Sequence, residues 1–189
     1  MRRTSLIAVA ALALVLTGCS SLLGSTGTVA PQTTSPAGSP STAAQPTPVP
    51  VVINCNLVLS DADAAGLTPS VKPIPTFAPA AGTLGATMVE QGARPCGWGA
   101  ESAATLEVVV AIPTAAGLTA AKKAASSTGQ VADPELSDGA YFEVVGGVGR
   151  AQVFIGSYWI EVASPDFATA DQAASVYSLV IHDLRSAGG

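Results

Sequence analysis

The feature that most limits what this chain can fold into is a long stretch without charge. No charged residue occurs between Arg3 and Asp61, and residues 20–54 are rich in Ser, Thr, Pro, Ala and Gly. Prolines stand at positions 31, 36, 40, 46, 48 and 50. Such a segment buries too little apolar surface to offset its conformational entropy, so we expect a disordered linker over residues 19–54. The folded domain is therefore expected over residues 55–189.

Residues 1–18 have the layout of a signal peptide. Two arginines precede an unbroken apolar run from Leu6 to Leu16. This run is too short to cross a bilayer, which takes roughly 20 residues. Leu16-Thr17-Gly18-Cys19 then matches the bacterial lipobox, in which the cysteine is lipidated and becomes the mature N-terminus. We expect lipidation at Cys19, and the alternative is a secreted protein with an ordinary cleavage site.

Lipidation would decide where the protein resides. A diacylglycerol thioether on Cys19 supplies two palmitate-like chains, each worth about 0.8 kcal/mol per buried CH₂, and two chains give stable anchoring. We expect an extracytoplasmic protein on the outer face of the cytoplasmic membrane, held through the lipid only. Without its signal peptide the chain keeps 13 acidic and 6 basic residues, or 13 − 6 = 7 excess negative charges. This charge argues against nucleic acid as a partner.

The cysteine count also fits an exported protein. If Cys19 is lipidated, Cys55 and Cys96 remain as a pair in an oxidising compartment. We expect a disulfide between them, and the alternative is two unrelated buried thiols. Two cysteines and one distant histidine lack the spacing of zinc ligands, so no metal site is expected. No motif indicates a cofactor.

The first part of the domain combines a capped helix with an irregular segment. Ser60 is placed as the N-cap of a short helix that carries aspartates in its first turn and ends at Gly66. Residues 68–83 contain four prolines and are expected to be irregular. Residues 85–91 are expected to form the first strand.

Alternating residues predict the later strands, and the clearest period-two pattern runs from Thr105 to Ile112. Glycines at 146, 147 and 149 lie between two other expected strands. A phosphate-binding loop would need a Gly-Lys-Ser/Thr sequence and a following helix, so we interpret these glycines as a hairpin turn. The remaining expected elements are a helix over 114–128, strands over 140–145, 150–155 and 158–163, and a helix with an apolar stripe over 168–185. This order predicts an α+β fold with an antiparallel sheet of about five strands and helices packed on it.

Several short motifs together resemble a known group of proteins. They are Cys19 in the lipobox, Cys55 at the start of the domain, Asp61-Ala62-Asp63 in a short helix and Cys96-Gly97-Trp98 before a strand. In this combination the chain is similar to small actinobacterial lipoproteins of unknown function, some of which resemble PsbP-like folds. The resemblance covers residues 55–163. It supports the disulfide and the fold class, and it implies no catalytic residues.

Three mid-strand glutamates are the strongest candidates for chemistry. Glu107, Glu143 and Glu161 lie opposite the apolar set of their strands. If the strands are neighbours, these carboxylates share a sheet face with aromatic residues, Phe154 among them. We interpret that face as solvated, as a binding face, or as the paired carboxylates of a glycoside hydrolase. The candidate binding face consists of Glu107, Tyr141, Glu143, Arg150, Trp159 and Glu161.

No catalytic motif accompanies these candidates. His182 is the only histidine, and the helical pattern places it away from the apolar stripe, so we expect an ordinary surface histidine rather than part of a catalytic triad. The sequence therefore favours a non-enzymatic binding or interaction domain in the cell envelope, with a small molecule or an envelope protein as its partner. The alternative is a cell-envelope hydrolase that uses the sheet-face carboxylates.

Overall fold

The structure is a computed structural model that describes residues 48–100, 103–136 and 138–188. Within these ranges all strand pairs are antiparallel and helices lie against the sheet, which confirms the expected α+β class. The signal peptide, Cys19 and most of the linker lie outside the described residues. Among the described residues, no helix has both the length and the apolar character that crossing a membrane requires.

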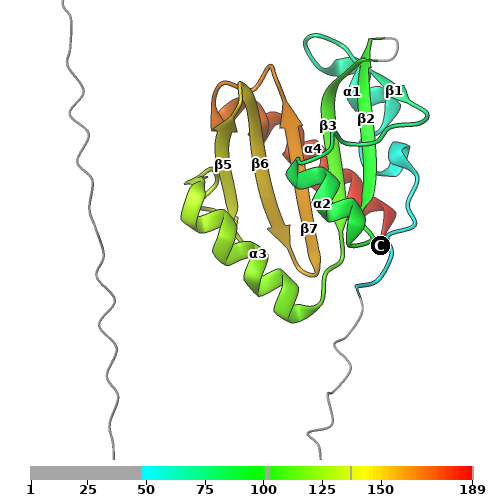
Figure 1. The fold of residues 1–189 in the computed structure, drawn as a ribbon. Helices are drawn as coiled ribbons and strands as arrows, with labels where there is room; N and C mark the ends of the chain where they lie inside the picture. Colours follow the sequence, from blue (N-terminus) through cyan, green and yellow to red (C-terminus); the bar gives the residue numbers. More distant parts are fainter. Residues whose placement is uncertain (1–47, 101–102, 137, 189) are drawn as a thin grey trace, which may run out of the picture. The chain divides into compact units, whose positions relative to one another are not determined.

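The described residues form a seven-stranded sheet in the order β1-β2-β3-β7-β6-β5-β4. The count differs from the expected five because β1, β2 and β4 were not expected, whereas the expected strand over 85–91 is a helix. In Figure 1, α2 and α3 lie on one side of the sheet and α4 lies on the other. The strands are β1 Lys72–Ile74, β2 Arg94–Ala100, β3 Ala103–Ala111, β4 Gln130–Val131, β5 Ala140–Val145, β6 Val148–Ile155 and β7 Tyr158–Ser164. The helices are a short 3₁₀ turn at Cys55–Leu57, α1 Asp61–Gly66, α2 Leu84–Glu90, α3 Ala115–Thr128 and α4 Ala170–Ala187.

The hydroxyl side chains of Ser60, Thr83 and Thr114 cap the N-termini of α1, α2 and α3. The Oγ of Ser60 accepts a hydrogen bond from the Asp63 amide at 3.2 Å, as expected for the N-cap of α1. The segment 85–91, expected to be a strand, is instead helix α2. Thr83 caps this helix by accepting from the Ala86 amide at 3.2 Å, and Met88 is fully buried on its inner side. The expected strand over 85–91 is therefore wrong, and the Thr83 cap is the local signal that favours a helix here.

The proline-rich segment 68–83 is less irregular than expected. Its residues Lys72–Ile74 form the edge strand β1, which pairs with residues 97–99 of β2. Gly97 makes room for this segment, because a side chain at Gly97 would collide with the ring of Phe77. The glycine of the Cys-Gly-Trp motif thus lets the proline-rich chain cross closely over β2.

The face under α4 is an apolar core. Trp98 and Cys96 lie on it, and both are fully buried. The expected stripe of α4 is confirmed as buried at Ala173, Val176, Tyr177, Val180, Ile181 and Leu184. The Cys55–Cys96 disulfide is present and ties the start of the domain to β2.

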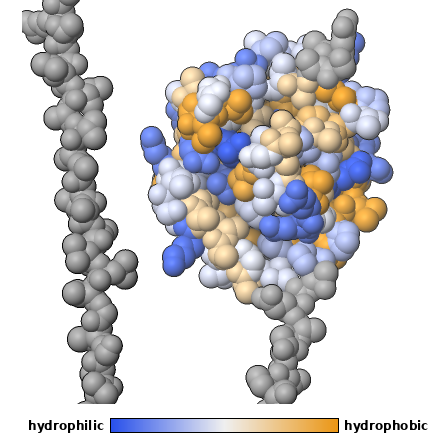
Figure 2. Space-filling model, viewed as in Figure 1, coloured by the Kyte–Doolittle hydropathy of each residue, from blue (hydrophilic) through white to orange (hydrophobic). Residues whose placement is uncertain are grey.

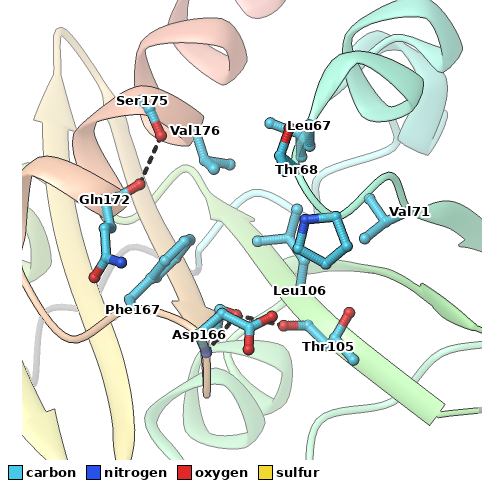
Figure 3. A pocket seen from close by; sticks show the side chains of 12 residues that line it. Leu67, Thr68, Val71, Thr105, Leu106, Asp166, Phe167, Gln172, Ser175 and Val176 are labelled. Atoms are coloured by element: carbon cyan, nitrogen blue, oxygen red, sulfur yellow. Dashed lines mark hydrogen bonds between the residues drawn. The ribbon is translucent and has the colours of Figure 1, made fainter.

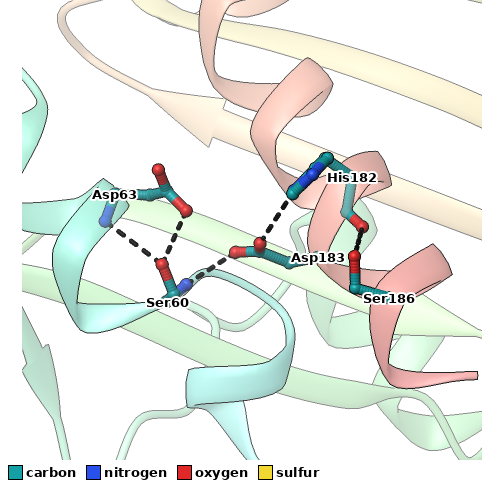
Figure 4. Close-up of polar contacts among 5 residues, drawn as sticks. All are labelled: Ser60, Asp63, His182, Asp183 and Ser186. Atoms are coloured by element: carbon teal, nitrogen blue, oxygen red, sulfur yellow. Dashed lines mark hydrogen bonds and ion pairs between the residues drawn. The ribbon is translucent and has the colours of Figure 1, made fainter.

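A polar contact joins α1 to α4 at the edge of this core (Figure 4). The amide of Ser60 donates to Asp183 Oδ2 at 2.8 Å, and Asp183 Oδ1 lies 3.3 Å from His182 Nδ1. The side chain of His182 is 75% exposed, as expected for a surface histidine. Asp183 therefore positions the N-cap of α1, while His182 stands in solvent.

One hairpin turn and one isolated antiparallel bridge complete the frame. Gly146 and Gly147 both have positive φ, 61° and 83°, in the two-residue turn between β5 and β6. This confirms the hairpin interpretation, since such turns require φ > 0 at both positions. Near the N-terminus, Val49 pairs with Ile112, and the Val51 amide donates to the Gly92 carbonyl at 3.0 Å. The last residues of the expected linker thus lie against the domain.

Candidate functional site

The sheet face under α2 and α3 brings the three candidate glutamates together with Arg150. Glu143 of β5 pairs with Arg150 of β6, Arg150 pairs with Ala163 of β7, and Ala163 pairs with Glu107 of β3. These four residues form one row across the sheet. Glu161 lies two residues before Ala163 in β7 and so points to the same face. The small side chain of Ala163 leaves space between the charged groups.

Arg150 is the cation at the centre of this group. Its Nε lies 2.5 Å from Glu161 Oε1, and its Nη1 lies 3.8 Å from Glu143 Oε1. The side chains are 13% exposed for Arg150, 21% for Glu143 and only 1% for Glu161. We call Glu107, Glu143, Arg150 and Glu161 the carboxylate cluster. With every member ionised, it would hold three negative charges and one positive charge.

Helix α2 closes over one side of the carboxylate cluster. A Cβ atom built on Gly85 would lie 2.1 Å from Glu107 Oε1 and 2.9 Å from Glu161 Oε2, so a side chain there would displace these carboxylates. Both of these oxygens are buried and have no hydrogen-bond partner among the described residues. The cluster therefore contains two unsatisfied carboxylate oxygens directly beneath the backbone of α2.

Burial changes the acidity of the two covered glutamates. It raises the pKa of Glu161 to about 7, with Arg150 opposing the shift and the charges of Glu107 and Glu143 adding to it. Burial also raises the pKa of Glu107, and Arg150 partly offsets that shift. A carboxylic acid that titrates near neutral pH is suited to hold a proton or to pass one on.

Aromatic residues fill the rest of this face. Phe154 stacks on Trp159 with ring centroids 6.2 Å apart, and Tyr141 meets Phe154 edge-on. Lys122 of α3 lies over the Phe154 ring, 5.8 Å from its centroid, and pairs with Asp138. These contacts place the aromatic residues inside a core with α3 rather than on an open surface.

The candidate residues thus come together on one sheet face. That face is covered by helices, so it is not the solvated surface that was one of the expectations. Trp159 and Glu161 are buried, while Glu107, Tyr141, Glu143 and Arg150 are half-buried. The reason is that α2, expected to be a strand, covers the cluster. Viewed from this side, the surface mixes hydrophilic and hydrophobic residues, with no single apolar patch (Figure 2).

A pocket that the sequence did not reveal lies on the other side of the sheet (Figure 3). Its volume is about 160 Å³, and its walls come from the α1–β1 segment, the ends of β3 and β7, and α4. The lining residues are Leu67, Thr68, Pro69, Val71, Thr105, Leu106, Ser164, Asp166, Phe167, Gln172, Ser175 and Val176. Because these residues come from distant parts of the chain and share no motif, no sequence signal marks them.

The polar groups of this pocket are partly engaged. Ser164 Oγ donates to the Thr105 carbonyl at 2.6 Å and accepts from the Asp166 amide at 3.1 Å. Ser175 Oγ donates to the Gln172 carbonyl at 2.7 Å. Six of the twelve lining residues are apolar and six are polar or charged, so a ligand of this pocket would meet both kinds of surface.

Neither site holds the ligand set of a metal ion. In the part of the chain that the structure describes, no three His, Cys, Asp or Glu side chains are arranged to coordinate one. Comparison of the chain with protein-family models, curated proteins and solved structures found no match in any of the three.

Proposed function

We propose that this chain is a lipid-anchored lipoprotein of the cell envelope, similar to those of actinobacteria, with a non-enzymatic binding or interaction domain. The lipobox ending at Cys19 and the uncharged linker over 19–54 support the anchor. The Cys55–Cys96 disulfide is typical of an exported protein. The domain would stand outside the cytoplasmic membrane, with the lipid as its only membrane contact.

The observation that carries the non-enzymatic proposal is the closure of α2 over the carboxylate cluster. A general acid must come within hydrogen-bond distance of the oxygen that it protonates. Glu161 is 1% exposed, and the backbone of Gly85 lies against it and Glu107. A glycan therefore has no access to this pair in the closed arrangement. The pocket of Figure 3 is open and is the better candidate for a ligand.

The hydrolase alternative has one observation in its favour. The raised pKa of Glu161, beside a second carboxylate, is a property that acid–base catalysts share. A screen of cell-wall glycans with the unmodified chain and with Glu107→Gln and Glu161→Gln separates the two proposals. Hydrolysis that both substitutions abolish would establish the enzyme. We expect no hydrolysis by any of the three proteins.

Native mass spectrometry of the mature chain, purified from its own host, tests the binding proposal. We expect a small molecule to be bound, and Ser175→Trp at the pocket wall to abolish its retention. Ser178→Trp is the matched control, because Ser178 is also exposed on α4 but does not line this pocket. If no molecule is bound and no partner is crosslinked on intact cells, the proposed binding function is contradicted.

Cys19→Ala tests the anchor. Metabolic labelling with a fatty-acid probe should mark the unmodified chain and leave the variant unlabelled, because the thioether forms on Sγ of Cys19. We expect the variant to accumulate as an uncleaved or mislocalised precursor. Equal labelling of the two proteins would overturn the lipoprotein proposal.

A further inference from the structure

The carboxylate cluster contains an arrangement that a binding domain alone does not explain. We infer that Glu107 and Glu161 together hold one proton beneath Gly85, and that this proton keeps helix α2 against the sheet. The inference concerns a proton-binding site and is independent of the ligand of the pocket. It rests on the positions of the two unpartnered oxygens and on the charge of the cluster.

The first argument is the hydrogen-bond count. Glu107 Oε1 and Glu161 Oε2 are buried, have no partner among the described residues, and both lie beneath the backbone of Gly85. A buried carboxylate oxygen without a donor is costly. A proton on one of the two carboxyl groups removes that group's charge, and so lowers the cost of burying the unpartnered oxygens.

The second argument is the charge. Arg150 contacts Glu161 and Glu143, so its one positive charge is divided between two carboxylates. Full ionisation would leave a net charge of −2 in a largely buried space. Two close carboxylates that cannot both remain ionised share a proton. The raised pKa values of Glu107 and Glu161 agree with this arrangement.

The surrounding elements bring no further cation to the pair. The groups that act on Glu161 are Glu107 from β3, Arg150 from β6 and Glu143 from β5. The ionisable residue of α2 is Glu90, which is exposed. On the α3 side, Lys122 pairs with Asp138 instead. Within the described chain, Arg150 is thus the cation of the cluster, and the shared proton is the remaining source of positive charge.

Helix α2 is built so that it can respond to this proton. Gly82 and Gly92, which flank it, have positive φ values of 80° and 90°, a conformation that suits glycine. Its inner side places Met88 in the core and Gly85 on the two carboxylates. When the proton leaves, the pair carries a second buried charge, and opening of α2 would expose that charge to water. We expect α2 to open more often at a pH above the apparent pKa of the pair.

Two measurements on the full mature chain in detergent micelles test this inference. Infrared spectroscopy at pH 6 should show a protonated, buried carboxyl band that is lost in Glu161→Gln. Hydrogen exchange of residues 84–90, corrected for the intrinsic rate, should increase at least several-fold between pH 6 and pH 8 in the unmodified chain. In Glu161→Gln, which imitates the protonated acid, the corrected rate should not change with pH.

Glu90→Gln is the matched control, because Glu90 lies on the same helix but faces solvent. This variant should show the same pH dependence as the unmodified chain. The inference is overturned if no protonated carboxyl is detected at pH 6, or if exchange of α2 depends on pH equally in the unmodified chain and in Glu161→Gln. If Glu161→Gln does not fold, the infrared band of the unmodified chain at pH 6 decides the matter by itself.

Discussion

The two faces of the sheet are both covered, but their chemistry differs. Under α4 the packed side chains are apolar, and the buried groups include Trp98, Val153 and Ile160. Under α2 and α3, a smaller apolar cluster around Phe154 and Met88 adjoins the carboxylate cluster. The stability that the α4 face provides should therefore not change with pH near neutrality, whereas the contribution of the other face should depend on protonation. From this difference we infer that the α4 face mainly stabilises the fold, whereas the packing of α2 on its face changes with pH.

The disulfide is the strongest constraint on the α4 face, and its removal should have the largest effect. Cys55 and Cys96 are 41 residues apart in the sequence. Closing a loop of this length stabilises the folded state by about 4 kcal/mol in the chain-entropy account. Denaturant unfolding with and without reductant measures the loss. The Cys55→Ala, Cys96→Ala double variant should not respond to reductant, and a change below about 1 kcal/mol in the unmodified chain would contradict the prediction.

The second prediction isolates the pH dependence of the α2 face. The pKa of Glu161 is raised from 4.5 to about 7, so the folded state keeps a proton that the unfolded state loses. This contribution to stability is complete below pH 4.5 and is lost as the pH rises to about 7. A shift of 7 − 4.5 = 2.5 pKa units corresponds to about 3 kcal/mol. Above about pH 7 the protonation of Glu161 causes no further loss of stability.

Unfolding curves of the unmodified chain and of Glu161→Gln at several pH values measure this contribution. The free energy of unfolding of the unmodified chain should fall relative to the variant between pH 4.5 and pH 8. Substitution of Val180→Ala on the α4 face should instead cost the same at every pH, roughly 1–3 kcal/mol. If the free energy of unfolding changes with pH equally in the unmodified chain and in Glu161→Gln, the α2 face is no more sensitive to pH than the α4 face.

The third prediction concerns the contact between α2 and the carboxylate cluster. Alanine in place of a helical glycine normally stabilises a protein by up to about 1 kcal/mol. Gly85→Ala should do the opposite and cost about 1–2 kcal/mol, because its Cβ would displace the Glu107 carboxylate. Gly66→Ala is the control, since nothing lies within 4 Å of its Cβ position. Combining Gly85→Ala with Glu107→Ala should recover most of the loss, as a double-mutant cycle would show.

The sequence predicted the α4 face far better than the α2 face. The stripe of α4, the β5–β6 hairpin and the Cys55–Cys96 bridge all depend on local patterns or on elimination, and the structure confirms them. The capped helix α1 was also predicted, because Ser60 and its aspartates are a local signal. Where the residues of one element alone carry the pattern, such as a cap, a stripe or turn glycines, the sequence is sufficient to predict that element.

The α2 face depends on contacts between distant segments. A seven-residue helix has too few turns to show periodicity, so segment 85–91 was taken for a strand, and the cover over Glu107 and Glu161 was missed. One sign was present in β3, where Val109 and Ala111 alternate with other apolar residues and are buried on the second face. A strand that is apolar on both sides is typical of a sheet covered on both faces. The grouping of the glutamates was expected, whereas their burial was not.

The last and smallest predicted effect concerns a polar atom on the apolar face. Tyr177 is buried, and its hydroxyl has no hydrogen-bond partner among the described residues. Tyr177→Phe removes this unsatisfied group without changing the shape of the side chain, so we expect stability to rise by up to about 1 kcal/mol. Because burial raises the pKa of Tyr177 above 10, the gain should be equal at pH 5 and pH 8. Unfolding curves at both pH values test it, with the half-buried Tyr158→Phe as a control that should change stability little. A gain that appeared only at high pH would mean that the α4 face is also coupled to a titrating group, and the contrast between the two faces would fail.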